Sequence, residues 1–137
     1  MAVAAAAAIA TATLAFVNDA RIAPANAEEV TIKRTELMNV TLGVAEGLDG
    51  VMVISELPPN GVAPRHTHPA DELSYVLEGA IELEIDGQAP VVYEAGETYH
   101  IPPGVVHAAR NPSDSAPTKI LVFWAAEAGQ PLTAPAP

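Results

Sequence analysis

Two histidines and a glutamate lie close together in the segment HTHPADE, residues 66–72. His66, His68 and Glu72 have the same parity, so in an extended chain their side chains leave on one face. Imidazole and carboxylate groups that converge in this way are ligands for transition-metal ions. The segment therefore predicts half of a metal site, and a further ligand must come from elsewhere in the chain.

The segment GETYHIPPGVVHAARN, residues 96–111, offers that ligand at His107. Its glycines allow turns and its two adjacent prolines stiffen the approach to the histidine. Ser74 has the inward parity and is a candidate to hydrogen bond to a ligand. His100 lies outside the pattern, and we expect a structural or surface role for it. Metal binding needs neutral imidazoles, so the affinity for the metal should decrease as the pH drops below about 6.5.

These two segments resemble the two sequence motifs of the cupin family. His66-x-His68-x3-Glu72-x6-Gly79 resembles the first motif, and Gly96-x5-Pro102-x-Gly104-x2-His107-x3-Asn111 matches the second. The first motif usually has glycine where this chain has Asn60, a residue that tolerates positive φ, so we expect the turn to be retained. The resemblance covers about residues 50–126.

The resemblance implies an all-β jelly-roll barrel of two antiparallel sheets and, for small single-domain members, a homodimer. It also implies one divalent transition-metal ion (Fe, Mn, Ni, Cu or Zn), bound by His66, His68, Glu72 and His107. Four such ligands around an octahedral ion leave two positions open for water, dioxygen or substrate.

Composition narrows the possibilities independently of the motifs. A chain of 137 residues is long enough for one domain with its own core. Its net charge of −11, with six Lys and Arg, provides no basic surface for nucleic acid or an anionic membrane. Because it has no cysteine, disulfides and thiolate metal sites are excluded. A small-molecule ligand or substrate remains as the expected partner.

Most of the chain after Glu28 has strand and turn patterns. Residues 80–86 alternate apolar and acidic side chains, which predicts a strand with one buried and one solvated face. The Asp86-Gly87 pair then predicts a hairpin into residues 91–93. Residues 119–124, KILVFW, are apolar on both faces, which indicates a strand covered on both sides, by the barrel interior and by another sheet or subunit. On pattern alone the fold is an all-β sandwich or barrel.

The N-terminal residues 1–27 are interpreted as a signal peptide. Residues 2–17 are apolar and uncharged, and Ala25-Asn26-Ala27 supplies a cleavage pattern, although no basic residue precedes the apolar run. The alternative is an Ala-rich tail or a helix packed on the domain. The mature chain, 28–137, would then be periplasmic or secreted and not membrane-bound, whereas without cleavage it would be cytoplasmic. Its Pro-rich C-terminal tail, residues 130–137, is expected to be extended or loosely attached.

The residues expected to face inward are apolar. Arg65, Arg110 and Tyr75 have outward parity, and no lysine or arginine has clear inward parity, which disfavours sugar acids and phosphorylated sugars as substrates. The leading hypothesis is a metal-dependent oxygenase that resembles quercetinase-type cupins, with Glu72 as ligand and general base. Two alternatives stay open: a metal-dependent lyase, isomerase or decarboxylase, and a non-catalytic periplasmic protein that binds a metal or small ligand.

Overall fold

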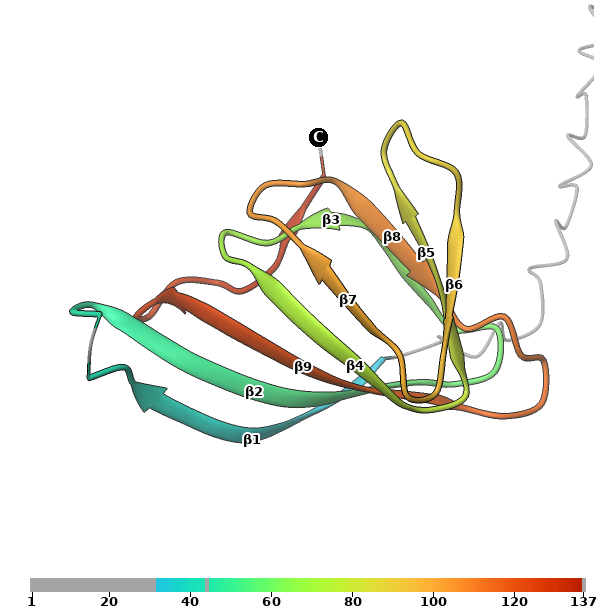
Figure 1. Ribbon diagram of the computed structural model, residues 1–137, viewed down its shortest axis with the longest axis horizontal. Coiled ribbons are helices and arrows are strands. Elements are labelled where there is room, and N and C mark those ends of the chain that lie inside the picture. Colours follow the sequence, from blue (N-terminus) through green and yellow to red (C-terminus); the bar gives the residue numbers. More distant parts are fainter. Residues whose placement is uncertain (1–31, 44, 137) are drawn as a thin grey trace, which may run out of the picture.

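The computed structural model describes residues 32–43 and 45–136, which form ten β-strands and, within these ranges, no helix (Figure 1). The strands are β1 (Lys33–Thr41), β2 (Leu48–Leu57), β3 (Val62–Thr67), β4 (Glu72–Glu78), β5 (Ala80–Ile85), β6 (Val91–Glu94), β7 (Thr98–Ile101), β8 (His107–Arg110), β9 (Thr118–Glu127) and β10 (Ala134–Pro135). The signal peptide expected at residues 1–27 lies outside the described residues. Among those described, no helix is long and apolar enough to cross a membrane.

The strands form two five-stranded sheets, and every pairing is antiparallel. The first sheet has the order β1-β2-β9-β4-β7 and the second the order β10-β3-β8-β5-β6. Figure 1 shows the second sheet facing the first, with the long strands β1, β2 and β9 extending past it on one side. This architecture confirms the predicted all-β jelly roll of two antiparallel sheets.

Strand β5 shows how side-chain alternation builds the core. Ile81 is completely buried and Leu83 is 3% exposed. Glu84, which follows Leu83, is exposed to solvent. The predicted hairpin is also present, because β5 pairs with β6 after a turn in which Gly87 has a φ of 79°. The core therefore lies between the two sheets, where inward side chains of both meet.

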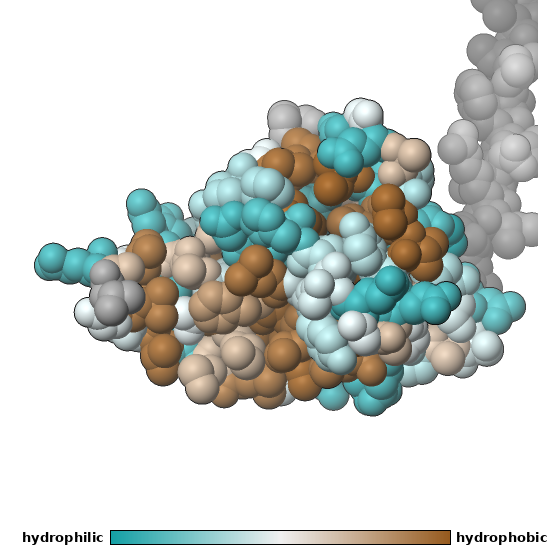
Figure 2. Space-filling model, viewed as in Figure 1, coloured by the Kyte–Doolittle hydropathy of each residue, from teal (hydrophilic) through white to brown (hydrophobic). Residues whose placement is uncertain are grey.

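Strand β9 is central in the first sheet and is apolar on both faces, as predicted. Its inward residues Ile120, Val122 and Trp124 are each 3% exposed. Its outward residues Leu121 and Phe123 are half-buried and line a shallow hollow on the outer face, together with residues of β4 and β7. Figure 2 shows apolar surface over this part of the molecule. The interior covers one face of β9, and no described segment of this chain covers the other.

Two asparagines fix the loops around the site. Asn60 adopts the expected positive φ, 57°, and so preserves the turn before β3. Asn111, the last residue of the second motif, is fully buried, and its Nδ2 group donates to the carbonyls of Leu57, Pro58 and Ala116 at 3.2, 3.0 and 2.8 Å. Asn111 follows β8 of the second sheet, whereas these carbonyls lie at the end of β2 and before β9 in the first sheet, so Asn111 ties strand ends of the two sheets together.

Candidate metal centre

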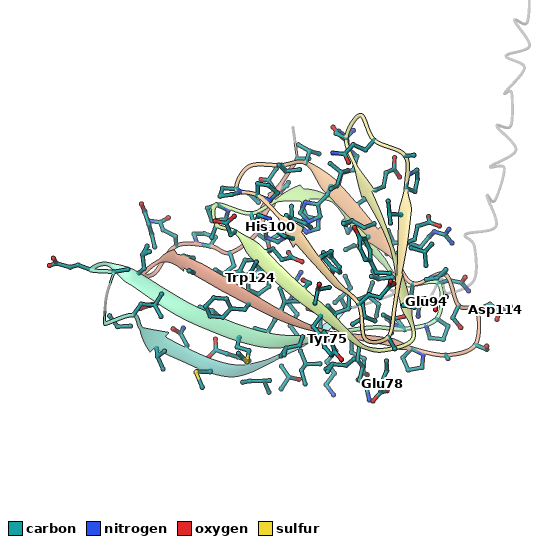
Figure 3. All side chains as sticks on the ribbon, viewed as in Figure 1. Tyr75, Glu78, Glu94, His100, Asp114 and Trp124 are labelled. Atoms are coloured by element: carbon teal, nitrogen blue, oxygen red, sulfur yellow. The ribbon has the colours of Figure 1, made fainter. Side chains whose placement is uncertain are left out.

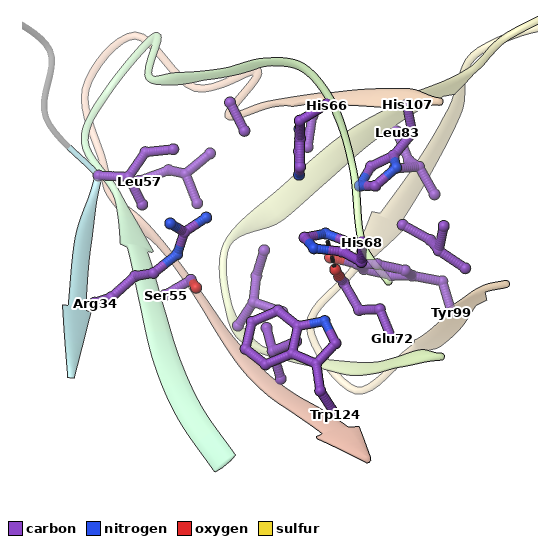
Figure 4. Close-up of a pocket in the computed structure, with 16 residues that line it drawn as sticks. Arg34, Ser55, Leu57, His66, His68, Glu72, Leu83, Tyr99, His107 and Trp124 are labelled. Carbon is purple, nitrogen blue, oxygen red and sulfur yellow. Dashed lines mark ion pairs between the residues drawn. The ribbon is translucent and has the colours of Figure 1, made fainter. Parts of the chain in front are cut away.

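The three predicted histidines converge inside the barrel. His66 on β3 lies directly opposite His107 on β8, and His68 follows the end of β3. The ring centroids are 4.2 to 5.0 Å apart, and one nitrogen from each ring lies within 4.8 Å of the others. Figure 4 shows the rings grouped at one side of the cavity. This three-histidine group could hold a metal ion.

A backbone carbonyl fixes each imidazole at its Nδ1 atom. The Nδ1–H groups of His66, His68 and His107 donate to the carbonyls of Pro64, Leu132 and Val105 at 2.7, 2.6 and 3.0 Å. Since a carbonyl only accepts, these bonds place the proton on Nδ1 and leave Nε2 of the neutral ring unprotonated, with a free electron pair. This pattern orients imidazoles for metal binding.

The chemistry of these atoms fits a divalent transition-metal ion. His68 Nε2 is buried, and with the ring proton on Nδ1 it has no hydrogen bond among the described residues, because its neighbour Glu72 Oε2, 2.7 Å away, also only accepts. Such an orphaned acceptor is costly unless another group binds it. Three nitrogen donors with a carboxylate beside them are a ligand set that Fe, Mn, Ni, Cu and Zn accept.

Glu72 lies beside the histidines but reaches them from the other sheet. Its Oε2 atom is 2.7 Å from His68 Nε2, and Oε1 accepts a 2.8 Å hydrogen bond from the Ser74 hydroxyl. The chain does not continue as one extended strand through residues 66–72. The chain leaves the second sheet after Thr67 and enters the first at Glu72, so the groups meet across the barrel interior. Ser74 contacts Glu72, as its inward parity suggested.

Burial sets the protonation states of the site. It lowers the pKa of His66 to about 4, and the nearby rings of His107 and His68 add to this, while the Pro64 carbonyl opposes it. Burial likewise lowers the pKa of His107. For Glu72, burial acts to raise the pKa, but the adjacent His68 ring and the Ser74 hydroxyl outweigh it, and the pKa lies below its usual value. His66 and His107 are thus neutral and Glu72 is ionised at pH 7, as metal binding requires.

A cavity of about 40 Å³ adjoins the histidines. This volume accommodates an ion and a small ligand. Its wall is largely apolar, as predicted, and includes Leu83, Ile101, Ile120, Val122 and Trp124. It also includes Tyr99, which sequence reasoning missed. Tyr99 pairs in register with inward-facing Ser74, and burial raises its pKa well above the usual value, so its hydroxyl stays protonated.

Arg34 also lines the cavity, and the expectation that no lysine or arginine faces inward is therefore wrong. It lies on edge strand β1, directly opposite Ser55 on β2, and Figure 4 shows both side chains directed toward the cavity. The sequence contained a signal for this position. Ile32 and Arg34 share parity, and both contribute to the cavity wall.

The other residues assigned outward positions do lie outside. Arg65 pairs with Asp86, and Arg110 pairs with Glu82 at 2.7 Å. His100 pairs with Asp71 at 2.6 Å on the surface. Tyr75 is 41% exposed on the outer face of β4 (Figure 3).

The C-terminal tail is extended and attached to the barrel. Strand β10 pairs with β3 through Ala134 and Pro135, which lie opposite Thr67 and His66. The carbonyl of Leu132, just before β10, is the one that accepts from His68. The tail therefore completes the surroundings of the histidine group.

Comparison with known proteins gives one family match. Residues 53–124 match the family described as "Cupin domain". Among curated proteins, "Germin-like protein subfamily 3 member 1" of Arabidopsis thaliana is 33% identical over 91 residues, which are 61% of this chain and 44% of that protein. "Germin-like protein subfamily 2 member 2" of the same plant is 30% identical over 109 residues, 67% of this chain and 50% of that protein. The chain thus spans about half the length of these relatives or less.

Solved structures share the architecture. An oxalate oxidase is 27% identical with a TM-score of 0.56, covering 72% of this chain and 52% of that one. The DMSP lyase DddQ from Ruegeria pomeroyi DSS-3 is 23% identical with a TM-score of 0.62, covering 77% and 51%. An uncharacterised double-stranded β-helix protein from Klebsiella pneumoniae is 22% identical with a TM-score of 0.63, covering 92% and 99%. The last two show the fold alone.

Proposed function

The chain belongs to the cupin family, and we propose that it is a metal-dependent oxygenase acting on a small organic substrate that binds the metal through oxygen. The observation that carries this proposal is the three-histidine group, whose Nε2 atoms meet beside an apolar cavity. The similarity to an oxalate oxidase, at 27% identity, supports an oxygen-dependent reaction.

We assign the ion to His66, His68 and His107 through Nε2, with Glu72 as fourth ligand. The 2.7 Å approach of Glu72 to His68 Nε2 supports this, because both groups direct free electron pairs to the same point. When bound, a divalent ion of this kind polarises a substrate oxygen and, where it is redox-active, exchanges electrons with dioxygen.

The protein's own groups have distinct tasks in this proposal. Glu72 is ionised and adjoins the cavity, so it also acts as general base for a substrate proton. The Ser74 hydroxyl holds one carboxylate oxygen and leaves the other directed at the histidines. The apolar wall excludes water, which strengthens electrostatic interactions in the site. The cavity volume of about 40 Å³ restricts the substrate to a small molecule, or to the small end of a larger one.

The test is metal analysis followed by oxygen uptake. We expect protein purified without chelators to contain close to one Fe, Mn, Ni or Cu per chain and to consume dioxygen with a panel of small oxygen-chelating substrates. Glu72→Gln should retain fold and lose turnover. Activity that persists with zinc and without dioxygen would select a lyase or isomerase instead. A chain that takes up no metal on reconstitution would contradict the metal site and leave a binding function.

We further propose a homodimer formed through the outer face of the first sheet. Leu73, Tyr75 and Leu77 on β4 are 50%, 41% and 38% exposed there, beside the outward residues of β9. Exposed apolar patches of this kind are typical of interfaces. Light scattering should give twice the chain mass, and Leu73→Asp should give a monomer. A wild-type monomer at micromolar concentration would contradict the proposal.

We also propose that the mature protein is periplasmic or secreted. The apolar segment at residues 2–17 and the Ala25-Asn26-Ala27 pattern support this. Mass spectrometry of the protein from its own cells should find Glu28 at the N-terminus. An intact N-terminus in the cytoplasmic fraction would contradict export.

A further inference from the structure

We propose that Arg34 forms an anion-binding subsite at the mouth of the cavity, and that the substrate is a small organic acid. One carboxylate of this acid binds Arg34, while a second oxygen-bearing end lies at the three-histidine group. The inference rests on the proposed function and adds the substrate class to it.

The register of the first sheet places Arg34 on the inner surface. Arg34 lies opposite Ser55, and Ser55 lies opposite Ile120 on β9, which in turn lies opposite Val76 on β4. Residues directly opposite each other on paired strands project to the same face. Since Ser55, Ile120 and Val76 are at most 7% exposed, this face is the barrel interior. Arg34 is thus the member of this row of inward-facing side chains that lies on the edge strand, and it contributes to the cavity wall.

The charge of Arg34 is not used by the described part of the protein. Three other cations form surface ion pairs: Arg65 with Asp86, Arg110 with Glu82, and Lys119 with Glu78. No carboxylate in residues 32–43 or 45–136 lies within ion-pair distance of Arg34. In a chain of net charge −11, a cation without such a partner on a cavity wall indicates an anionic ligand.

The wall between Arg34 and the histidines offers further donors. Trp124 is 3% exposed, and its Nε1–H has no hydrogen-bond partner among the described residues. Figure 4 shows the indole nitrogen on the side of the ring that faces His68. The Ser55 hydroxyl lies beside Arg34. Guanidinium and indole groups only donate and a carboxylate only accepts, so these groups are complementary to the oxygens of an acid.

Geometry favours a carboxylate over a phosphate ester. A planar guanidinium forms two parallel hydrogen bonds with a carboxylate, so one arginine suffices. A phosphate dianion has more oxygens to satisfy, and no second lysine or arginine of the described chain lines this cavity. The cavity of about 40 Å³ also favours the smaller group.

The test uses dicarboxylates of increasing length, malonate, succinate and glutarate, each compared with its monoamide. Binding is measured by calorimetry on the full chain loaded with zinc, which avoids turnover. Each pair retains one carboxylate for the metal and differs only at the other end. At one length or more, we expect wild type to bind the diacid about tenfold more tightly than the monoamide. Arg34→Gln should bind both equally, and Arg34→Lys should keep part of the preference.

Arg65→Gln is the matched control, since Arg65 lies outside the cavity and pairs with Asp86. It should keep the full preference. Zinc content, measured for every variant, distinguishes a failure of the metal site from a failure of the Arg34 subsite. A wild type without zinc contradicts the metal site itself. Zinc-loaded wild type without any preference, or Arg34→Gln with an unchanged one, overturns the Arg34 subsite alone. Tighter binding of phosphonoacetate than malonate, lost in Arg34→Gln, overturns the carboxylate assignment.

Discussion

The two ends of the cavity differ in how firmly their polar groups are held. At the metal end, His66, His68 and His107 are 8%, 2% and 2% exposed, and a backbone carbonyl fixes each ring. At the mouth, Arg34 lies on edge strand β1, every residue of which is exposed. The metal end is therefore preorganised, whereas the mouth is free to adjust to a ligand. The difference suggests that metal binding and substrate choice are controlled by separate parts of the barrel.

Removing a histidine should have the largest effect. We expect His107→Ala to lower metal affinity by more than about 100-fold, because a ligand and its fixed orientation are lost together. Competition with a chromophoric chelator measures this. His100→Ala is the matched control, since His100 is exposed and pairs with Asp71, and it should bind metal as wild type does. Equal losses in both variants would mean that the three-histidine group is not the site.

The metal end was largely predictable from the sequence, because the spacing of the histidines and the glutamate in the two motifs identifies its residues. His66 and His107 lie opposite each other on paired strands, and Asn60 and the β5–β6 hairpin have the expected conformations. The change of sheet before Glu72 was not predictable. Local parity cannot show that the chain changes sheets between two residues, although it correctly placed Glu72 beside the histidines.

The mouth and the C-terminal tail were harder to predict, because their roles depend on contacts distant in sequence. The Leu132 carbonyl meets His68 across 64 residues, and no side-chain pattern encodes a backbone acceptor. Arg34 is polar on an edge strand, where alternation is weak evidence for direction. Its shared parity with Ile32 is a weak signal by itself, and the register of β1 against β2 shows that it belongs to the cavity wall.

Truncation tests whether the tail belongs to the preorganised end. Deleting residues 131–137 removes the carbonyl that holds His68, and we expect metal affinity to fall about 10- to 100-fold. Deleting residues 134–137 removes β10 but retains Leu132, so it should cost less. Circular dichroism would check that both variants remain folded. Equal affinity in the two truncated chains would show that the Leu132 carbonyl does not orient the ring.

The stability of the metal-free protein should depend on pH through His66. Its pKa is about 4 when folded and about 6.5 when unfolded, so the unfolded chain binds more protons between these values. Stability is therefore lost as pH falls below about 6.5, and His66 alone should cost on the order of 2 kcal/mol at pH 5. The lowered pKa of Glu72 has the same sign at lower pH, because it stabilises the folded state above the ordinary carboxyl pKa and this stability is lost as the pH falls through the lowered value. Urea unfolding with chelator at pH 7.5 and 5 measures the change, which His66→Gln should reduce.

The smallest effect should come from changing the mouth. Arg34 is exposed and makes no ion pair with the described residues, so Arg34→Gln should change the free energy of unfolding by less than about 0.5 kcal/mol. Metal content should also be unchanged, because the side chain belongs to another strand than any of the histidines. Urea unfolding at pH 7.5 and metal analysis of the same preparation provide both values. A loss well above 1 kcal/mol would assign Arg34 to the framework of the barrel, and the mouth would then be as constrained as the metal end.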